Sequence, residues 1–282
     1  METIATDVYI ETTYPGVTVG AFVLPHGLVH IDVPLLPDHV RAWRASLMGL
    51  NTGTERVLVL LDAHPDRALN ARLMECPILA HEKAAHLLRS RPPTSRVTGE
   101  ETGAEWESHS GWSTTRWTPP ELSFSENLVL HWSEHPLVIE ARPGPNNGAV
   151  WVRWERERVL FIGDAVCKDQ PPFLASADIP QWIEHLRELL QPQYSDYLIV
   201  CGRGGVIPSQ VIRSQIAFLE AVQESLQKVP VDAADTIFEQ LAQHLLERFN
   251  FPPEKKYFFR LRYGLKYYHT RRQPVVVPLE EE

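Results

Sequence analysis

Short apolar runs, each bounded by turn residues, recur through the first two thirds of the chain and predict β-strands. The strongest run is Val57-Leu58-Val59-Leu60-Leu61, whose length and aliphatic composition are typical of a buried strand. Hairpin strands with glycine and proline turns are predicted within residues 8–33. Strands are also predicted at 128–132, 137–141, 149–154 and 158–162. The chain therefore divides into two β-rich halves.

Segments with helical periodicity lie between and after these strands. A helix is expected to begin at Pro37, with Asp38 as its cap, because proline and a short polar residue are typical of helix starts. The basic and aromatic segment 255–272 predicts a helix with a solvated charged face, or alternatively a surface that binds an anion or a nucleic acid. Residues 91–127, rich in Pro, Ser, Thr and Gly, predict an irregular crossing between the two halves. The remaining predicted helices are 69–74, 82–90, 180–191, 208–228 and 232–249.

The candidate chemistry lies where predicted strands end. The hexapeptide Asp62-Ala63-His64-Pro65-Asp66-Arg67 directly follows the run that ends at Leu61. Asp164 follows the apolar run 159–162, and Arg203 follows the run 199–201. Because the ends of strands are common places for binding and catalytic sites, we expect these side chains to converge at one rim of the fold.

Together these segments resemble the metallo-β-lactamase fold superfamily in their order and spacing. The family's His-x-His-x-Asp-His motif corresponds to residues 62–67, and its metal-bridging Asp corresponds to Asp164. Its Pro-Gly-His turn corresponds to residues 143–145, and its Gly-His-Gly turn to residues 202–204. Its opening hairpin is similar to residues 16–32. Each match alone is unspecific, but their common order identifies the fold.

The resemblance covers about residues 7–215 and implies an α/β (α+β) fold. The expected architecture is a four-layer αββα sandwich, in which two mixed β-sheets pack together and helices cover their outer faces. Residues 1–282 are expected to form a single domain, with a helical C-terminal extension at about 208–270.

The resemblance also implies a dinuclear metal centre, but most of the family's ligand histidines are replaced in this chain. Asp62 and Arg67 stand where the motif begins and ends with His, while Pro145 and Arg203 replace the histidines of the two later turns. A guanidinium keeps its proton in a protein and cannot ligate a metal. The second metal site is therefore expected to be lost.

Two interpretations of the first site remain open. Asp62, His64 and Asp164 supply one imidazole and two carboxylates, a candidate single site for one divalent Zn, Mn or Fe ion. Alternatively, the carboxylates pair with Arg67 and Arg203, and no cofactor is bound. The second interpretation is favoured, because nearby guanidiniums compete for the same oxygens.

These interpretations predict two functions. In the first, the protein is a pseudoenzyme, a non-catalytic or weakly active relative that binds a partner or a small anionic molecule, with Arg67 and Arg203 as the ligand-binding residues. In the alternative, it is a mononuclear metal-dependent hydrolase of an ester, thioester, lactone or phosphoester. Asp66 is the candidate catalytic residue only in that alternative.

Composition and charge limit the kinds of partner and the cellular location that the sequence predicts. The 282 residues are 44% hydrophobic, enough for a large core, and the net charge of −9 argues against a nucleic-acid partner. No apolar run approaches 18 residues, so no membrane partner is expected. Cys76, Cys167 and Cys201 are widely separated, and the N-terminal residues lack a secretory signal pattern. These features predict reduced thiols and a cytoplasmic location.

Overall fold

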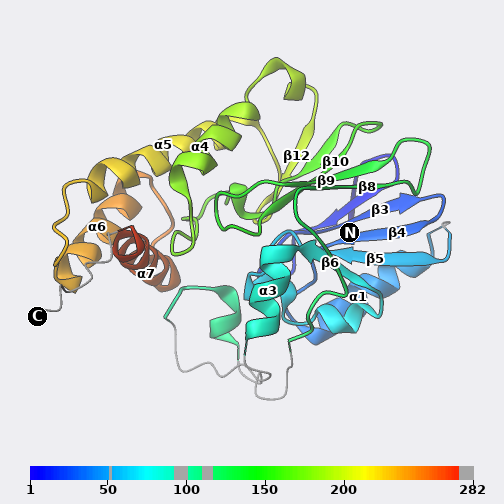
Figure 1. Cartoon of the computed structure of the whole chain (residues 1–282), viewed down its shortest axis with the longest axis horizontal. Coiled ribbons are helices and arrows are strands. Elements are labelled where there is room, and N and C mark those ends of the chain that lie inside the picture. Colours follow the sequence, from blue (N-terminus) through cyan, green and yellow to red (C-terminus); the bar gives the residue numbers. More distant parts are fainter. Residues whose placement is uncertain (51–52, 92–100, 110–116, 273–282) are drawn as a thin grey trace, which may run out of the picture.

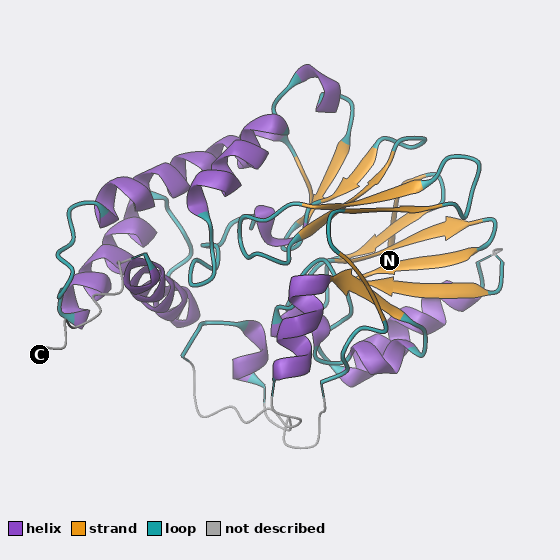
Figure 2. Cartoon of the chain, viewed as in Figure 1, coloured by secondary structure: helices purple, strands orange, loops and turns teal. Residues whose placement is uncertain are grey.

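The computed structural model describes residues 1–50, 53–91, 101–109 and 117–272. Two mixed β-sheets pack face to face, and helices cover the outer face of each sheet (Figure 1). Colouring by secondary structure separates the paired strands from the helical layers and from the helix-rich C-terminal part (Figure 2). The predicted four-layer sandwich with a C-terminal helical extension is confirmed.

The first sheet has seven strands in the order β1-β2-β3-β4-β5-β6-β7. Strands β1 to β4 are antiparallel to one another, whereas β4 to β7 run parallel. Since parallel neighbours end at the same edge, the residues that follow β4 and β5 lie close together. The strand bounds are β1 (Glu2–Ala5), β2 (Val8–Glu11), β3 (Val19–Leu24), β4 (Gly27–Ile31), β5 (Glu55–Val59), β6 (Ile78–His81) and β7 (Leu122–Phe124).

The second sheet has six strands in the order β13-β12-β11-β10-β9-β8. Only β11 and β12 pair in parallel among its described strands, so the residues after these two strands also share an edge. The bounds are β8 (Asn127–Leu130), β9 (Leu137–Ala141), β10 (Val150–Trp154), β11 (Val159–Phe161), β12 (Leu198–Cys201) and β13 (Gly205–Ile207).

The core between the sheets consists of aliphatic and aromatic side chains from both inner faces. Phe22 of β3 packs edge-on against Trp154 of β10 and Phe161 of β11, with ring centroids 5.7 and 5.3 Å apart. Burial of such residues contributes about 1.5–3 kcal/mol each. This apolar layer fixes the two sheets relative to each other, and with them the strand ends that carry the site.

Helices α1 (Pro37–Met48) and α3 (Glu82–Ser90) pack on the outer face of the first sheet. Helices α4 (Ile179–Glu188), α5 (Ser209–Leu226), α6 (Asp235–Arg248) and α7 (Lys255–Arg271) form the layer outside the second sheet (Figure 1). The short helical turns are α2 (Pro65–Ala68), η1 (Ala71–Met74), η2 (Glu105–Ser108), η4 (Gly163–Ala165) and η5 (Pro192–Tyr194). Within the described ranges, no helix combines the length and apolar character needed to cross a membrane.

The structure corrects three local predictions. Asp38 is not the cap of α1, because Leu36 occupies that position and Asp38 lies in the first turn, where it pairs with Arg41. The helix predicted at 69–74 is reduced to the short turn η1, which α2 precedes. Residues 255–272 do form helix α7, but Arg260 is only 1% exposed and is not part of a solvated face. The predicted irregular crossing at 91–127 contains η2 and β7, and its residues 92–100 and 110–116 lie outside the described residues.

Candidate functional site

Five strand ends and turns bring acidic and basic side chains together at one rim of the sandwich. Asp32 directly follows β4, and Asp62 lies three residues after β5. Asp164 lies in η4 after β11, and Arg203 lies in the turn between β12 and β13. Arg67 extends from α2. The predicted convergence is therefore observed, and it joins residues of both sheets.

Arg67 is the centre of this cluster. Its side chain is 0% exposed and forms ion pairs with three carboxylates. Nη1 donates to Asp32, Nε lies 2.8 Å from an oxygen of Asp62, and Nη2 contacts Asp164. The second oxygen of Asp32 accepts the backbone N–H of Leu61 at 2.9 Å. One guanidinium therefore contacts carboxylates from three different strand ends.

Arg203 forms the second half of the network. Its Nη1 donates to Asp66 at 2.9 Å and to the carbonyl oxygen of Gly16 at 2.8 Å, while Nε and Nη2 each lie 3.3 Å from Asp164 Oδ2. The backbone before it must approach closely, since a Cβ at Gly202 would lie 2.5 Å from Asp164 Oδ1. Glycine is therefore required at that position to allow the contact.

Asp66 connects the cluster to the η2 turn. Besides Arg203, its carboxylate accepts the backbone N–H groups of Glu105 at 3.1 Å and Trp106 at 2.8 Å. The side chain is 0% exposed, so these donors replace the water that a carboxylate requires. Asp66 therefore holds the position of η2 and is fully engaged as an acceptor.

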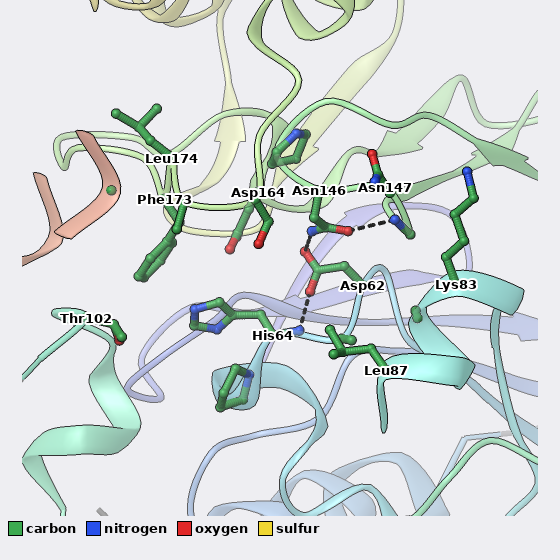
Figure 3. Close-up of a pocket in the computed structure, with 18 of the residues that line it drawn as sticks. Asp62, His64, Lys83, Leu87, Thr102, Asn146, Asn147, Asp164, Phe173 and Leu174 are labelled. Atoms are coloured by element: carbon green, nitrogen blue, oxygen red, sulfur yellow. Dashed lines mark hydrogen bonds between the residues drawn. The ribbon is translucent and has the colours of Figure 1, made fainter. Parts of the chain in front are cut away.

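His64 and Asp62 are engaged in local hydrogen bonds. His64 precedes α2, and its Nδ1 accepts the backbone N–H of Asp66 at 3.2 Å, which caps the helical turn. Asp62 accepts the backbone N–H of His64 at 2.7 Å and the side-chain amide of Asn146 at 3.0 Å (Figure 3). The imidazole of His64 also packs against Phe173, with ring centroids 4.4 Å apart.

Burial and ion pairing shift the pKa values of these groups in different directions. Burial raises the pKa of Asp32 to about 7, although Arg67 opposes that shift. Burial also disfavours ionised Asp164, but Arg203 and Arg67 outweigh it and hold its pKa below the usual range. Burial lowers the pKa of His64 to about 4, with Asp66 opposing and Arg203 reinforcing the shift. His64 is therefore neutral at pH 7.

The residues of the cluster do not fit the dinuclear metal centre that the family resemblance implies. Asp62, Asp66 and Asp164 already direct oxygens toward guanidinium or N–H donors. His64 Nδ1 already accepts a backbone hydrogen bond. Among the residues that the structure describes, no group of three or more His, Cys, Asp or Glu side chains is arranged to hold a metal ion.

A cavity of about 420 Å³ lies next to the ion-pair cluster and is partly lined by Asp62, His64 and Asp164 (Figure 3). Its other walls come from α3, from the loop that carries Phe173 and Leu174, and from α7. Arg67 and Arg203 are buried behind the carboxylates and do not line it. The volume lies within the usual range for small-molecule sites.

Sequence reasoning did not single out three residues of this cluster and cavity, namely Asp32, Asn146 and Arg260. A signal for Asp32 was present, because it ends an apolar strand in the same way as Asp62 does. Asn146 lies in the turn that resembles the family's Pro-Gly-His turn, in which the family's ligand position corresponds to Pro145 instead. Pro145 does line the cavity, together with Asn146. Arg260 gave no signal, since a helical charge run usually lies in solvent.

Comparison with known proteins agrees with this architecture. The sequence model of the metallo-beta-lactamase superfamily matches residues 78–204, a stretch that includes Asp164 and Arg203 but begins after Arg67. The matched stretch is therefore similar to that superfamily, and the chain has the metallo-β-lactamase fold. A comparison with curated proteins finds no match.

Solved structures show the same fold at low sequence identity. A metallo-beta-lactamase family protein from Thermus thermophilus is 16% identical, with a TM-score of 0.66 and 94% of each chain covered. A metallo-beta-lactamase from Pontibacter korlensis is 16% identical, with a TM-score of 0.61 over 78% of this chain and 97% of that chain. One from Erythrobacter litoralis is 14% identical, with a TM-score of 0.59 over 78% and 95%.

Replacing Arg67 with methionine is expected to destabilise the fold, because three buried carboxylates lose their shared cation. Removing one partner of a buried ion pair costs about 3–5 kcal/mol, and the free energy of unfolding in urea should fall by that amount. The control is Arg187→Met, which removes an exposed pair with Glu220 and should cost less than about 1 kcal/mol. Similar small losses for both variants would contradict the central role of Arg67.

The depressed pKa of His64 predicts a stability loss in acid. Between its ordinary value of 6.5 and the folded value of about 4, the unfolded chain binds a proton that the folded chain does not. The free energy of unfolding should therefore fall by about 3 kcal/mol from pH 6.5 to pH 4, relative to His64→Asn. The two proteins are compared by urea denaturation, with pH 8 as reference. A difference that is independent of pH would rule out an imidazole whose pKa is lowered in the folded protein.

Proposed function

We propose that this protein is a metallo-β-lactamase-fold pseudoenzyme in which a salt-bridge network replaces the dinuclear metal centre. Its role is to bind a small anionic ligand, with weak hydrolytic activity or none. The three separated cysteines support a cytoplasmic location.

The contact of Arg67 with three carboxylates carries this proposal. The oxygens that the family resemblance assigns to metal binding are instead used by Arg67 and Arg203. A metal would have to displace two guanidiniums that are only 0% and 3% exposed, so neither charged group could easily move into water. Desolvated, unpaired charge costs several kcal/mol, so the network competes strongly with any dication.

The cavity supports a binding role. It lies at the rim of the sandwich, where the strand ends converge, and its lining combines polar groups with apolar side chains. The guanidiniums of the cluster do not themselves reach the ligand, because Arg67 and Arg203 lie behind Asp62 and Asp164. Their contribution is to offset part of the negative charge of the rim, where four carboxylates would otherwise repel an anion.

Restoring histidines at the two arginine positions is expected to raise metal affinity. The double variant Arg67→His with Arg203→His supplies two neutral nitrogen ligands and removes two positive charges. Its control is Arg67→Gln with Arg203→Gln, which removes the charges without adding imidazoles. The affinity for Zn²⁺, measured by competition with a chromophoric chelator, should be at least about tenfold higher for the histidine variant, or about 1.4 kcal/mol. Equal affinities would argue against a replaced metal centre.

The wild-type protein is expected to show little hydrolysis of a β-lactam, a lactone, a thioester or a phosphodiester in the presence of added Zn²⁺ or Mn²⁺. The reason is that its carboxylates are paired and its second set of imidazoles is missing. Initial rates are measured with His64→Ala as the control. Turnover above about 1 per second that this substitution abolishes would favour the mononuclear hydrolase instead.

A further inference from the structure

The cavity wall is positively charged although the chain as a whole is acidic. Lys83 on α3, Arg91 directly after α3, and Arg260 and Arg271 on α7 all line it. The carboxylates of Asp62 and Asp164 line it too, so four positive charges face two negative ones. Behind the wall, Arg67 and Arg203 balance the charges of Asp32 and Asp66. The site therefore has an excess of positive charge in a protein of net charge −9.

Of these four cations, Arg91 has a buried hydrogen-bond donor for which the described residues supply no acceptor. Its Nη1 is buried and has no hydrogen-bond partner among the described residues. Its guanidinium stacks on the ring of Trp117, with 4.3 Å from Cζ to the ring centroid, and forms no ion pair within the described part of the chain. A buried donor without an acceptor costs about 1–3 kcal/mol. The described residues therefore leave the Arg91 guanidinium short of one acceptor.

Arg260 adds a second positive charge without a carboxylate partner in the described ranges. It is 1% exposed, and its donors reach the carbonyl oxygens of Gly103 and Pro171 and the side-chain oxygen of Gln170. Its guanidinium stacks on Phe173, 4.0 Å from the ring centroid. These neutral acceptors satisfy its hydrogen bonds but leave its charge uncompensated.

Apolar side chains lie beside the cationic ones. Leu87 precedes Arg91 by one helical turn and lines the same cavity, so an anion at Arg91 would have an apolar surface next to it. Phe173 and Leu174 line the wall toward α7, as Figure 3 shows. A cationic group with an apolar surface beside it favours a ligand that has an anionic group and an apolar part.

We propose that the cavity binds an organic acid with an apolar body, the acid group lying at Arg91 and the body against Leu87, Phe173 and Leu174. This inference rests on the proposed binding function and specifies the class of its ligand. Binding would give the Arg91 guanidinium an acceptor and compensate the excess positive charge, while the apolar body would leave water.

The test is isothermal titration calorimetry of the full chain with butyrate, hexanoate and octanoate. Affinity should rise about fourfold for each added methylene, the increase expected when it is buried. Arg91→Gln should weaken octanoate binding at least about tenfold, which corresponds to about 1.4 kcal/mol. The matched control is Arg89→Gln, which removes the same charge from the exposed side of α3 and should leave binding unchanged.

Two further ligands separate the contribution of the acid group to binding from that of the apolar body. Octan-1-ol has the apolar body without the charge and should bind the wild type no better than octanoate binds Arg91→Gln. Octyl phosphate carries a different acid group, and its loss of binding in Arg91→Gln would support the same site. Equal octanoate affinity in the Arg91 and Arg89 variants, or no dependence on chain length, would overturn the inference. Such a result, with hydrolysis still absent, would leave the replaced metal centre standing.

Discussion

The guanidinium of Arg67, shared by Asp32, Asp62 and Asp164, is the interaction on which the rim of this sandwich depends. Asp32 and Asp62 end strands of the first sheet, whereas Asp164 follows a strand of the second. Arg203 crosses in the opposite direction, from the second sheet to Asp66. The apolar core joins the faces of the sheets, and this network joins their edges. Without it, the convergent strand ends would bring like charges together in a place that water does not reach.

The proposed function rests on the same network, in which guanidiniums contact the carboxylates that the family resemblance assigns to a metal site. A metal ion and a guanidinium both neutralise carboxylates, but only the metal lowers the pKa of a bound water and polarises a substrate oxygen. The planar donors of arginine also match several carboxylate oxygens at once. In the proposed function, the guanidiniums of residues 67 and 203 supply positive charge at the rim without the electrophile that a metal would provide.

The sequence predicted the fold well because strand runs such as 57–61 and 159–162 have both faces buried and no competing helical pattern. It also placed Asp62, Asp164 and Arg203 at one rim, since each follows such a run. The partners of Arg67 were only partly predictable, because pairing with Asp32 requires β4 and β5 to be parallel neighbours. Arg260 was not predictable, since its inward direction depends on the packing of α7 against the loop that carries Phe173.

Phe173 connects the buried network to the cavity wall. Its ring lies 4.8 Å from Cζ of Arg203 and 4.0 Å from Cζ of Arg260, and its centroid is 4.4 Å from that of His64. Positive charge over an aromatic face is favourable even when the charge is desolvated. The ring can therefore hold two guanidiniums in one apolar region, one neutralised by aspartates and one not. In the proposed complex the apolar body of the ligand would meet this ring on the cavity side, while the carboxylates behind it remain paired. The C-terminal extension thus completes the wall of a site whose strand ends belong to the sandwich.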